Sequence, residues 1–204
     1  CDDMVLPHEN TLTLAYKAFC DITGVSASVS VCLEKHIPAG AGLGGGSSDA
    51  AALVNALECM YNVQLSMENR WKIASKVGSD VFFFLSPEVV DSKCALVSGR
   101  GEIVKAFPSR QDLFFVLICP EVHSSTKDAY RLVDNRYAPD WLWSGPTYSS
   151  LIDEYNSNVK SWSFINSFED PLVMRYPQIG YALQDLKNAG ASYVQMSGSG
   201  SAVF

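Results

Sequence analysis

The sequence has no apolar run long enough to span a membrane, because such a span needs about 20 consecutive apolar residues. It also has no C-x-x-C pair and no Cys and His residues at zinc-binding spacing. We therefore interpret the cysteines as reduced, mostly buried thiols of a cytoplasmic enzyme, or of a plastid stroma if the source is a plant, rather than as disulfides or metal ligands. The six cysteines are Cys1, Cys20, Cys32, Cys59, Cys94 and Cys119.

Positive charge is scarce, since 15 Lys and Arg residues face 22 Asp and Glu residues and the net charge is −7. An acidic surface repels a polyphosphate backbone, which argues against nucleic acid as a partner. With 48% hydrophobic and 18% charged residues, the 204-residue chain is too apolar for disorder and can build one large or two small α/β domains. We expect a domain boundary near Pro108–Asp112.

The two ends of the chain are interpreted as cut. It opens with Cys1-Asp2-Asp3 without an initiator Met, and it ends at Ala202-Val203-Phe204 within a predicted strand. No signal peptide is visible, but a targeting segment could have been lost, so its absence decides little.

Apolar residues at a spacing of three to four predict helices, and alternating or continuous apolar runs predict strands. Helices are predicted at 10–22, at Ser48–Met60, from the cap Ser66 through Val77, from the capping box Ser125–Asp128 through Leu132, at 150–160 and at Pro177–Asn188. Strands are predicted at Val25–Leu33, at the buried run Leu113–Cys119, in a hairpin of Ala95–Val97 with Glu102–Ala106, and at Tyr193–Met196 and Ala202–Phe204. Residues 136–149 are predicted to be an irregular loop.

The most informative stretch is the glycine-rich segment Pro38–Ser48, which places five glycines within residues 40–46. Glycines allow close approach of the backbone, and the unpaired N–H groups of the helix that follows point to the same place. Together they predict a polyphosphate site, with Ser47 and Ser48 able to cap the helix or to meet a phosphate or Mg²⁺. The alternative, a flexible linker, does not fit a position between a strand and an amphipathic helix.

This segment lacks the marks of two common phosphate loops. No Gly-Lys-Ser/Thr closes it, which excludes a Walker A loop. No acidic residue ends a second strand about 20 residues later, which excludes the dinucleotide-binding fingerprint.

Asp80, in Gly78-Ser79-Asp80-Val81, stands at the start of a very apolar run. Taken alone, such a residue is more often a helix cap. After a phosphate loop, it could be the carboxylate that orients a substrate hydroxyl and takes its proton, as a kinase requires. The second glycine turn, Ser197–Ser201, also has two possible interpretations. It is either a plain tight hairpin or a loop that faces phosphate or substrate.

Three segments together resemble the motifs of the GHMP kinases, namely Pro38–Ser48, Gly78–Val81 and Met196–Ser201. The resemblance runs from about His8 to Phe204. Further agreement lies in Gly99-x-Gly-Glu102, Ser125-Thr126-x-x-Ala129-Tyr130, Asn166-x-Phe168-Glu169 and Tyr176-Pro177-x-Ile179. The triple glycine before Ser47 is most similar to the branch that phosphorylates 4-diphosphocytidyl-2-C-methyl-D-erythritol, a cytidine-diphosphate methylerythritol of non-mevalonate isoprenoid synthesis.

The resemblance implies an α+β, two-domain GHMP kinase fold. Residues 1–109 would be the ATP-binding N-terminal domain, like domain 2 of ribosomal protein S5 and lacking its first strands. Residues 110–204 would be a ferredoxin-like C-terminal domain.

The resemblance also implies site residues. Asp80 would be the catalytic acid/base at the substrate hydroxyl, Tyr130 would lie against the cytosine ring, and Ser48 would lie near Mg²⁺. Thr11 and Lys35 would lie near the adenosine of ATP. The ATP phosphates would be wrapped by Pro38, Ala39, Gly40, Ala41, Gly42, Leu43, Gly44, Gly45, Gly46, Ser47 and Ser48. The substrate side would be completed by Gly198, Ser199 and Gly200.

The chain departs from the family pattern in three ways. The opening Pro-x-Lys-x-Asn strand and the Tyr-His pair behind it are absent, and His8, His36 and His123 cannot replace that His. As it stands, the chain would be slow or inactive unless the intact protein supplies that segment. Phe82 replaces the usual Pro after Asp-Val, and Asp49 replaces the usual Asn, which places an acid in the first helical turn near the phosphates.

Three functions remain open from the sequence: this kinase activity, another GHMP kinase acting on a different alcohol such as mevalonate or homoserine, and a catalytically inactive nucleotide-binding relative. Oligomeric state is not indicated.

Overall fold

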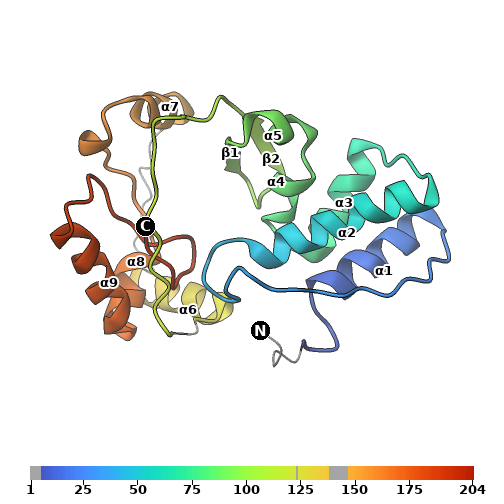
Figure 1. Ribbon diagram of the computed structural model, residues 1–204, viewed down its shortest axis with the longest axis horizontal. Coiled ribbons are helices and arrows are strands. Elements are labelled where there is room, and N and C mark those ends of the chain that lie inside the picture. Colours follow the sequence, from blue (N-terminus) through green and yellow to red (C-terminus); the bar gives the residue numbers. More distant parts are fainter. Residues whose placement is uncertain (1–5, 123, 138–146) are drawn as a thin grey trace. The chain divides into compact units, whose positions relative to one another are not determined.

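The structure is a computed structural model that describes residues 6–122, 124–137 and 147–204 (Figure 1). Within these ranges the chain is mainly helical and contains one regular sheet, of two strands. None of the helices there is long and apolar enough to cross a membrane.

The chain forms two compact units, and the glycine-rich segment is divided between them. The first unit comprises Cys1–Ile37 and Gly44–Ser109, and the second comprises Pro38–Leu43 and Arg110–Phe204. Leu43 and Gly44 are consecutive residues, so the segment passes from the second unit to the first at a single peptide bond.

Three helices build the first unit: α1 (Thr11–Thr23), α2 (Gly45–Tyr61) and α3 (Met67–Val77). Figure 1 shows α1 next to both α2 and α3, in agreement with their contacts. α1 begins with a capping box at Asn10, and α3 begins where the Ser66 hydroxyl accepts from the third helical N–H. The predicted helices at 10–22 and after Ser66 are confirmed.

Alanines and larger apolar residues together fill the core between these helices. The short helix α4 (Val81–Leu85) packs its apolar side against the same core, and the Phe82 ring meets the Trp71 ring edge-on with centroids 5.5 Å apart. The fully or almost fully buried members from α1, α2 and α3 are Ala15, Ala18, Phe19, Ala50, Ala51, Val54, Leu57, Ile73 and Ala74.

After α4, the chain forms α5 (Pro87–Ser92) and then the antiparallel hairpin of β1 (Ala95–Ser98) and β2 (Ile103–Ala106). Ala95 pairs with Ala106, and the register continues to Ser98 opposite Ile103. The predicted hairpin is therefore confirmed.

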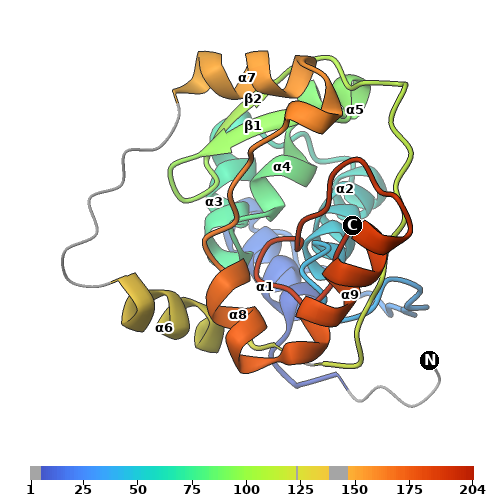
Figure 2. The ribbon, with the colours of Figure 1, turned by 90° about the vertical axis from the view of Figure 1, so that its left-hand side faces the viewer.

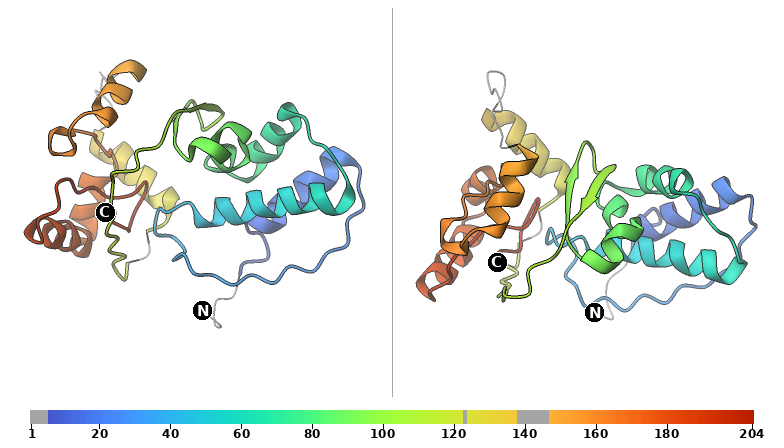
Figure 3. Two further views of the ribbon diagram at one scale, coloured as in Figure 1. Left: turned by 45° about the horizontal axis from the view of Figure 1, so that its top comes forward. Right: turned by 90° about the horizontal axis from the view of Figure 1, so that it is seen from above.

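Val25–Leu33 is not a strand, which makes that prediction wrong. Figure 3 shows the chain between α1 and α2 as an extended trace without a strand arrow. The expected alternation is nevertheless present in the burial, since Ala27 is buried while Ser26 and Ser28 are exposed. A strand also needs a hydrogen-bonded ladder, and no strand among the described residues pairs with this segment.

The second unit holds helices α6 (Thr126–Tyr137), α7 (Tyr148–Asn156), α8 (Glu169–Arg175) and α9 (Pro177–Asn188), with the 3₁₀ turn η1 (Val159–Ser161) between α7 and α8. Figure 2 shows α8 beside α9, as their contacts also indicate. The buried apolar core of this unit consists of Ala129, Leu172, Ile179, Ala182, Leu183, Leu186, Met196 and Val203.

The helices of the second unit agree in part with the sequence predictions. α9 is confirmed with both of its bounds, and a helix lies near 150–160, although it begins at Tyr148 and ends at Asn156. α6 continues to Tyr137, beyond the predicted end at Leu132. The rest of the predicted loop 136–149 lies largely outside the described residues. α8 was not predicted at all.

The glycine turn Ser197–Ser201 joins two antiparallel segments, as predicted. The backbones of Gln195 and Phe204 exchange two hydrogen bonds, and Ser197 N–H donates to Ala202 O at 2.8 Å. The pairing consists of single bridges rather than regular strands, and Val203 also bridges to Ile118.

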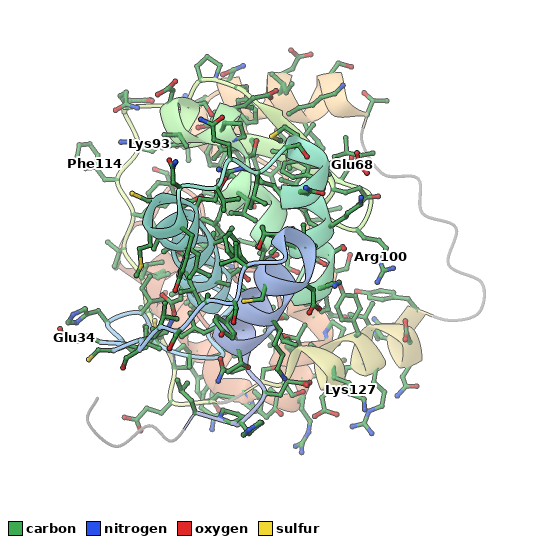
Figure 4. All side chains as sticks on the ribbon, turned by 90° about the vertical axis from the view of Figure 1, so that its right-hand side faces the viewer. Glu34, Glu68, Lys93, Arg100, Phe114 and Lys127 are labelled. Carbon is green, nitrogen blue, oxygen red and sulfur yellow. The ribbon has the colours of Figure 1, made fainter. Side chains whose placement is uncertain are left out.

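The run Leu113–Cys119 is not a buried strand, contrary to the prediction. The Phe114 side chain is 95% exposed, and Figure 4 shows it projecting away from the ribbon. Among the described residues, Ile118 alone of this run forms a backbone bridge, so an apolar run by itself does not make a strand. The expectation of mostly buried thiols is also wrong, because the described cysteines are free and none is buried: Cys20 and Cys94 are partly exposed, and Cys32, Cys59 and Cys119 are exposed.

Candidate active site

The N-terminus of α2 has no side-chain cap, and we call it open for that reason. Its N-cap is Gly44, at φ +67°, and no side chain caps the helix. The expectation that Ser47 and Ser48 cap it is therefore wrong, because the helix already begins at Gly45 and both serines lie in its first turn. The first N–H groups of a helix have no intrahelical partners and stand at the positive end of its dipole, so this end can receive an anion.

Two of the predicted nucleotide-contacting side chains border this helix start. A Cβ atom added to Gly45 would lie 3.1 Å from Lys35 Nζ, and one added to Gly46 would lie 3.4 Å from Thr11 Oγ1. Larger residues at these glycines would therefore fill the space beside the ammonium and the hydroxyl. The fold thus brings Thr11 from α1 and Lys35 from the extended segment to the first turn of α2.

The Lys35 ammonium forms an ion pair with Asp49, and the two side chains are 12% and 27% exposed. Asp49 belongs to the second turn of α2 rather than the first, because the helix begins earlier than its sequence pattern predicts. The extra acid is thus neutralised by its partner, which lessens its repulsion of an anion at the helix start.

Asp80 lies beside the same helix end. It occupies the N-cap position of α4 but makes no side-chain capping bond, so the helix-cap interpretation is wrong. Its Oδ2 atom is 3.9 Å from the position that a Cβ atom on Gly44 would take. The Phe84 ring is also close to that position, at 3.3 Å. An exposed carboxylate and an open helix N-terminus therefore meet at Gly44.

The hairpin turn supports the segment that carries Asp80, a role that sequence reasoning missed. Gly101, at φ +118°, comes so close that a Cβ atom there would lie 2.3 Å from Ser79 O. The Glu102 carboxylate accepts from Arg100 N–H at 2.6 Å, and its pKa is lowered by hydrogen bonds from its own backbone N–H and that of Arg100. The family-like pattern Gly99-x-Gly-Glu102 was the available signal for this support.

In the second unit, the first part of the glycine-rich segment packs on the second glycine turn. Ala202 N–H donates to Ala41 O at 3.0 Å, and Ser197 Oγ donates to Gly42 O at 2.8 Å. Gly42, at φ +73°, is so close that a Cβ atom would lie 2.2 Å from Ser197 O. Gly42 is therefore required both by its backbone conformation and by this contact.

Tyr130 stands on the exposed side of α6, with 58% of its surface accessible, and its ring meets the Phe168 ring edge-on at 4.9 Å. From the start of the same helix, Thr126 Oγ1 lies 3.3 Å from Ser199 Oγ in the glycine turn. The predicted substrate residues Gly198, Ser199 and Gly200 thus lie close to α6.

The described part of the chain contains no group of three or more His, Cys, Asp or Glu side chains that could enclose a metal ion. A magnesium ion that also binds phosphate oxygens needs few protein ligands. The Ser48 hydroxyl, in the open first turn of α2, fits such a role by its chemistry.

The predicted site residues thus fall into two groups. The first unit gathers Thr11, Lys35, Gly44, Gly45, Gly46, Ser47, Ser48 and Asp80 around the start of α2. The second unit holds Pro38, Ala39, Gly40, Ala41, Gly42, Leu43, Tyr130, Gly198, Ser199 and Gly200.

Comparison with known proteins adds independent findings. Residues 10–87 match the family model of the GHMP kinases N terminal domain. A 4-diphosphocytidyl-2-C-methyl-D-erythritol kinase of Treponema pallidum (strain Nichols) is 42% identical over 207 residues, which cover 98% of this chain and 69% of the relative. The enzyme of the same name from Chlorobium limicola is 37% identical, with 100% and 70% covered.

A solved structure is similar as well. The crystal structure of 4-(cytidine 5'-diphospho)-2C-methyl-D-erythritol kinase superposes with a TM-score of 0.65 at 29% identity, covering 97% of this chain and 70% of that chain. The α+β GHMP kinase fold expected from the sequence is thereby confirmed.

Proposed function

Since this chain belongs to the 4-diphosphocytidyl-2-C-methyl-D-erythritol kinases, a family of GHMP kinases, we propose that the intact protein uses ATP to phosphorylate a hydroxyl of 4-diphosphocytidyl-2-C-methyl-D-erythritol. The observation that carries this proposal is the Asp80 carboxylate beside Gly44, where the open end of α2 begins. The reaction would serve isoprenoid precursor synthesis by the non-mevalonate route.

The two proposed domains have different roles. Residues 1–109 act as the ATP-binding domain and residues 110–204 as the C-terminal domain. The backbone N–H groups at the start of α2 and the adjoining Pro38–Leu43 receive the triphosphate. Thr11 and Lys35 lie next to the helix start and contact the nucleotide, although Lys35 must do so while it is paired with Asp49.

Asp80 is the proposed acid/base. Its carboxylate accepts the proton of the substrate hydroxyl as that oxygen forms a bond to the γ-phosphorus. The bond from the γ-phosphorus to the β,γ-bridging oxygen breaks, and ADP leaves. When bound, Mg²⁺ offsets negative charge on the phosphate oxygens, and Ser48 is the side chain proposed to hold it.

On the substrate side, Tyr130 is the proposed support for the cytosine ring. Its ring is exposed yet held edge-on by Phe168, so it presents a fixed aromatic surface. Gly198, Ser199 and Gly200 offer backbone N–H groups and a hydroxyl for the polar part of the substrate.

The experiment is a coupled measurement of ADP release by the intact protein with three alcohols: 4-diphosphocytidyl-2-C-methyl-D-erythritol, mevalonate and homoserine. We expect ATP-dependent turnover with the first alone. Turnover with mevalonate or homoserine but not with the first would reject the substrate. ATP binding without turnover on any alcohol would indicate a catalytically inactive relative.

A further inference from the structure

Asn166 holds the second glycine turn through both ends of its amide. Its Nδ2 donates to Met196 O and to Gly198 O, each at 2.8 Å, and its Oδ1 accepts from Phe168 N–H at 2.9 Å. One side chain thus uses both donors and one acceptor on backbone groups, which only an amide can do. The turn is fixed on either side of Ser197.

Glu169, at the start of α8, adds a third link to the same turn. Its Oε2 accepts from Met196 N–H at 2.8 Å, so both polar backbone groups of Met196 are bound by the segment 166–169. Met196 itself is buried in the core of the second unit. Asn166 and Glu169 together therefore fix the position of the Met196 backbone, where the chain enters the turn.

The glycine turn Ser197–Ser201 also contacts the first part of the glycine-rich segment, at Gly42. Ser197, which lies between the two carbonyl groups that Asn166 binds, donates its hydroxyl to Gly42 O at 2.8 Å. Ser197 and Gly42 are also in close contact, because a Cβ atom on Gly42 would lie 2.2 Å from Ser197 O. The position of Ser197 therefore helps to set the position of Gly42. These links run from Asn166 through Ser197 to Gly42 entirely within the second unit.

We infer that Asn166 is a positioning residue for nucleotide binding: by fixing Met196 and Gly198 it orients Ser197, which holds Gly42 and the preceding part of the phosphate loop. The inference rests on the proposed use of Pro38–Ser48 as the ATP loop. It assigns a role to the Asn166-x-Phe168-Glu169 segment that the proposed mechanism does not use.

The test compares Asn166→Asp with Gln195→Glu in the intact protein. Gln195 is the control, because its Nε2 also donates to a backbone carbonyl in the same unit, but to Phe164 O, at 2.7 Å, which lies outside the turn. Asn166→Asp sets a carboxylate against two carbonyl oxygens and Gln195→Glu sets one against a single carbonyl oxygen. Both variants therefore lower stability, and Asn166→Asp lowers it more.

The readout is the Kd of ATP measured by calorimetry without any alcohol, together with the KM for ATP and kcat. We expect Asn166→Asp to raise the Kd of ATP about tenfold, whereas Gln195→Glu changes the melting temperature but leaves the Kd within about twofold. An Asn166→Asp protein that folds, melts at a lower temperature and still binds ATP like the wild type would overturn the inference.

A second variant keeps the inference testable if Asn166→Asp does not fold. Ser197→Ala removes only the hydroxyl that holds Gly42, and we expect it to raise the Kd of ATP about threefold to tenfold. If the double variant folds, its loss in the free energy of ATP binding should be smaller than the sum of the losses in the two single variants, because both act through the same link. Unchanged affinity in Ser197→Ala, or fully additive effects, would refute it. Because the Kd needs no alcohol, failure of the substrate assignment would leave this result readable.

Discussion

Replacing Gly42 by alanine separates the demands of backbone conformation from those of packing in the phosphate loop. Gly42 has φ +73°, and a non-glycine residue in this region costs about 1–2 kcal/mol. The new Cβ atom would lie 2.2 Å from Ser197 O, whereas ordinary contact begins at 3.4 Å, so the loop must move by about 1.2 Å. A displacement of about 1 Å in a positioning element can lower a rate about 100-fold.

Gly24 offers a matched control for this change. It has φ +72°, and nothing lies within 4 Å of its Cβ position. We expect Gly24→Ala to lower the free energy of unfolding by about 1–2 kcal/mol without changing kcat/KM for ATP. Gly42→Ala should lower kcat/KM for ATP about 10-fold to 100-fold. If Gly42→Ala were as active as Gly24→Ala, the packing of the loop on Ser197 would have no part in nucleotide binding.

Two further predictions concern the stability of each unit. Leu57→Ala should lower the free energy of unfolding of the first unit, measured in urea, by about 2–5 kcal/mol, because the Leu57 side chain is fully buried. Met60→Ala on the same helix should change it by less than about 0.5 kcal/mol, because the Met60 side chain is 66% exposed. Equal effects of the two substitutions would refute the packing of α2. Burial, aided by the charges of Glu169 and Glu154, raises the pKa of Tyr193 to about 12. Because the folded state then holds this proton more tightly than the unfolded state, Tyr193 stabilises the fold below about pH 10, and this contribution is lost as the pH rises toward about 12. Alkaline unfolding curves should show a smaller loss for Tyr193→Phe over that range, and an identical loss would contradict the assignment.

The sequence predicted the helices well, because their caps and apolar spacing are local signals. Asn10, Ser66 and Pro177 each mark a helix start that the structure confirms. α2 begins three residues early because Gly44, rather than a serine, is its cap, and a glycine cap gives no side-chain signal. α8 is only seven residues long and contains Pro171, so its pattern was too short to recognise.

Strands were predicted less well, for a physical reason. The runs at Val25–Leu33 and Leu113–Cys119 have strand-like composition, but a strand exists only where another segment supplies hydrogen bonds. That partner is not local, and the described residues pair with Ile118 alone in these runs.

In the candidate site too, local motifs could be recognised from the sequence, whereas contacts between distant residues could not. The glycine-rich segment and Asp80 were recognisable as motifs, but their proximity was not, since it depends on the packing of α4 against α2 and α3. The contact of Ser197 with Gly42 joins residues 155 positions apart and has no local signal. The role inferred for Asn166 therefore required the structure.

The central claim is that the Asp80 carboxylate works beside the open end of α2, and Asp80→Asn tests it most directly. The change preserves the size of the side chain, but it replaces a charged carboxylate that can take a proton by a neutral amide that cannot. In the intact protein we predict that kcat falls by a factor of about 100 to 10,000 while the Kd of ATP stays within about threefold. An Asp80→Asn protein that keeps the wild-type kcat would contradict the account.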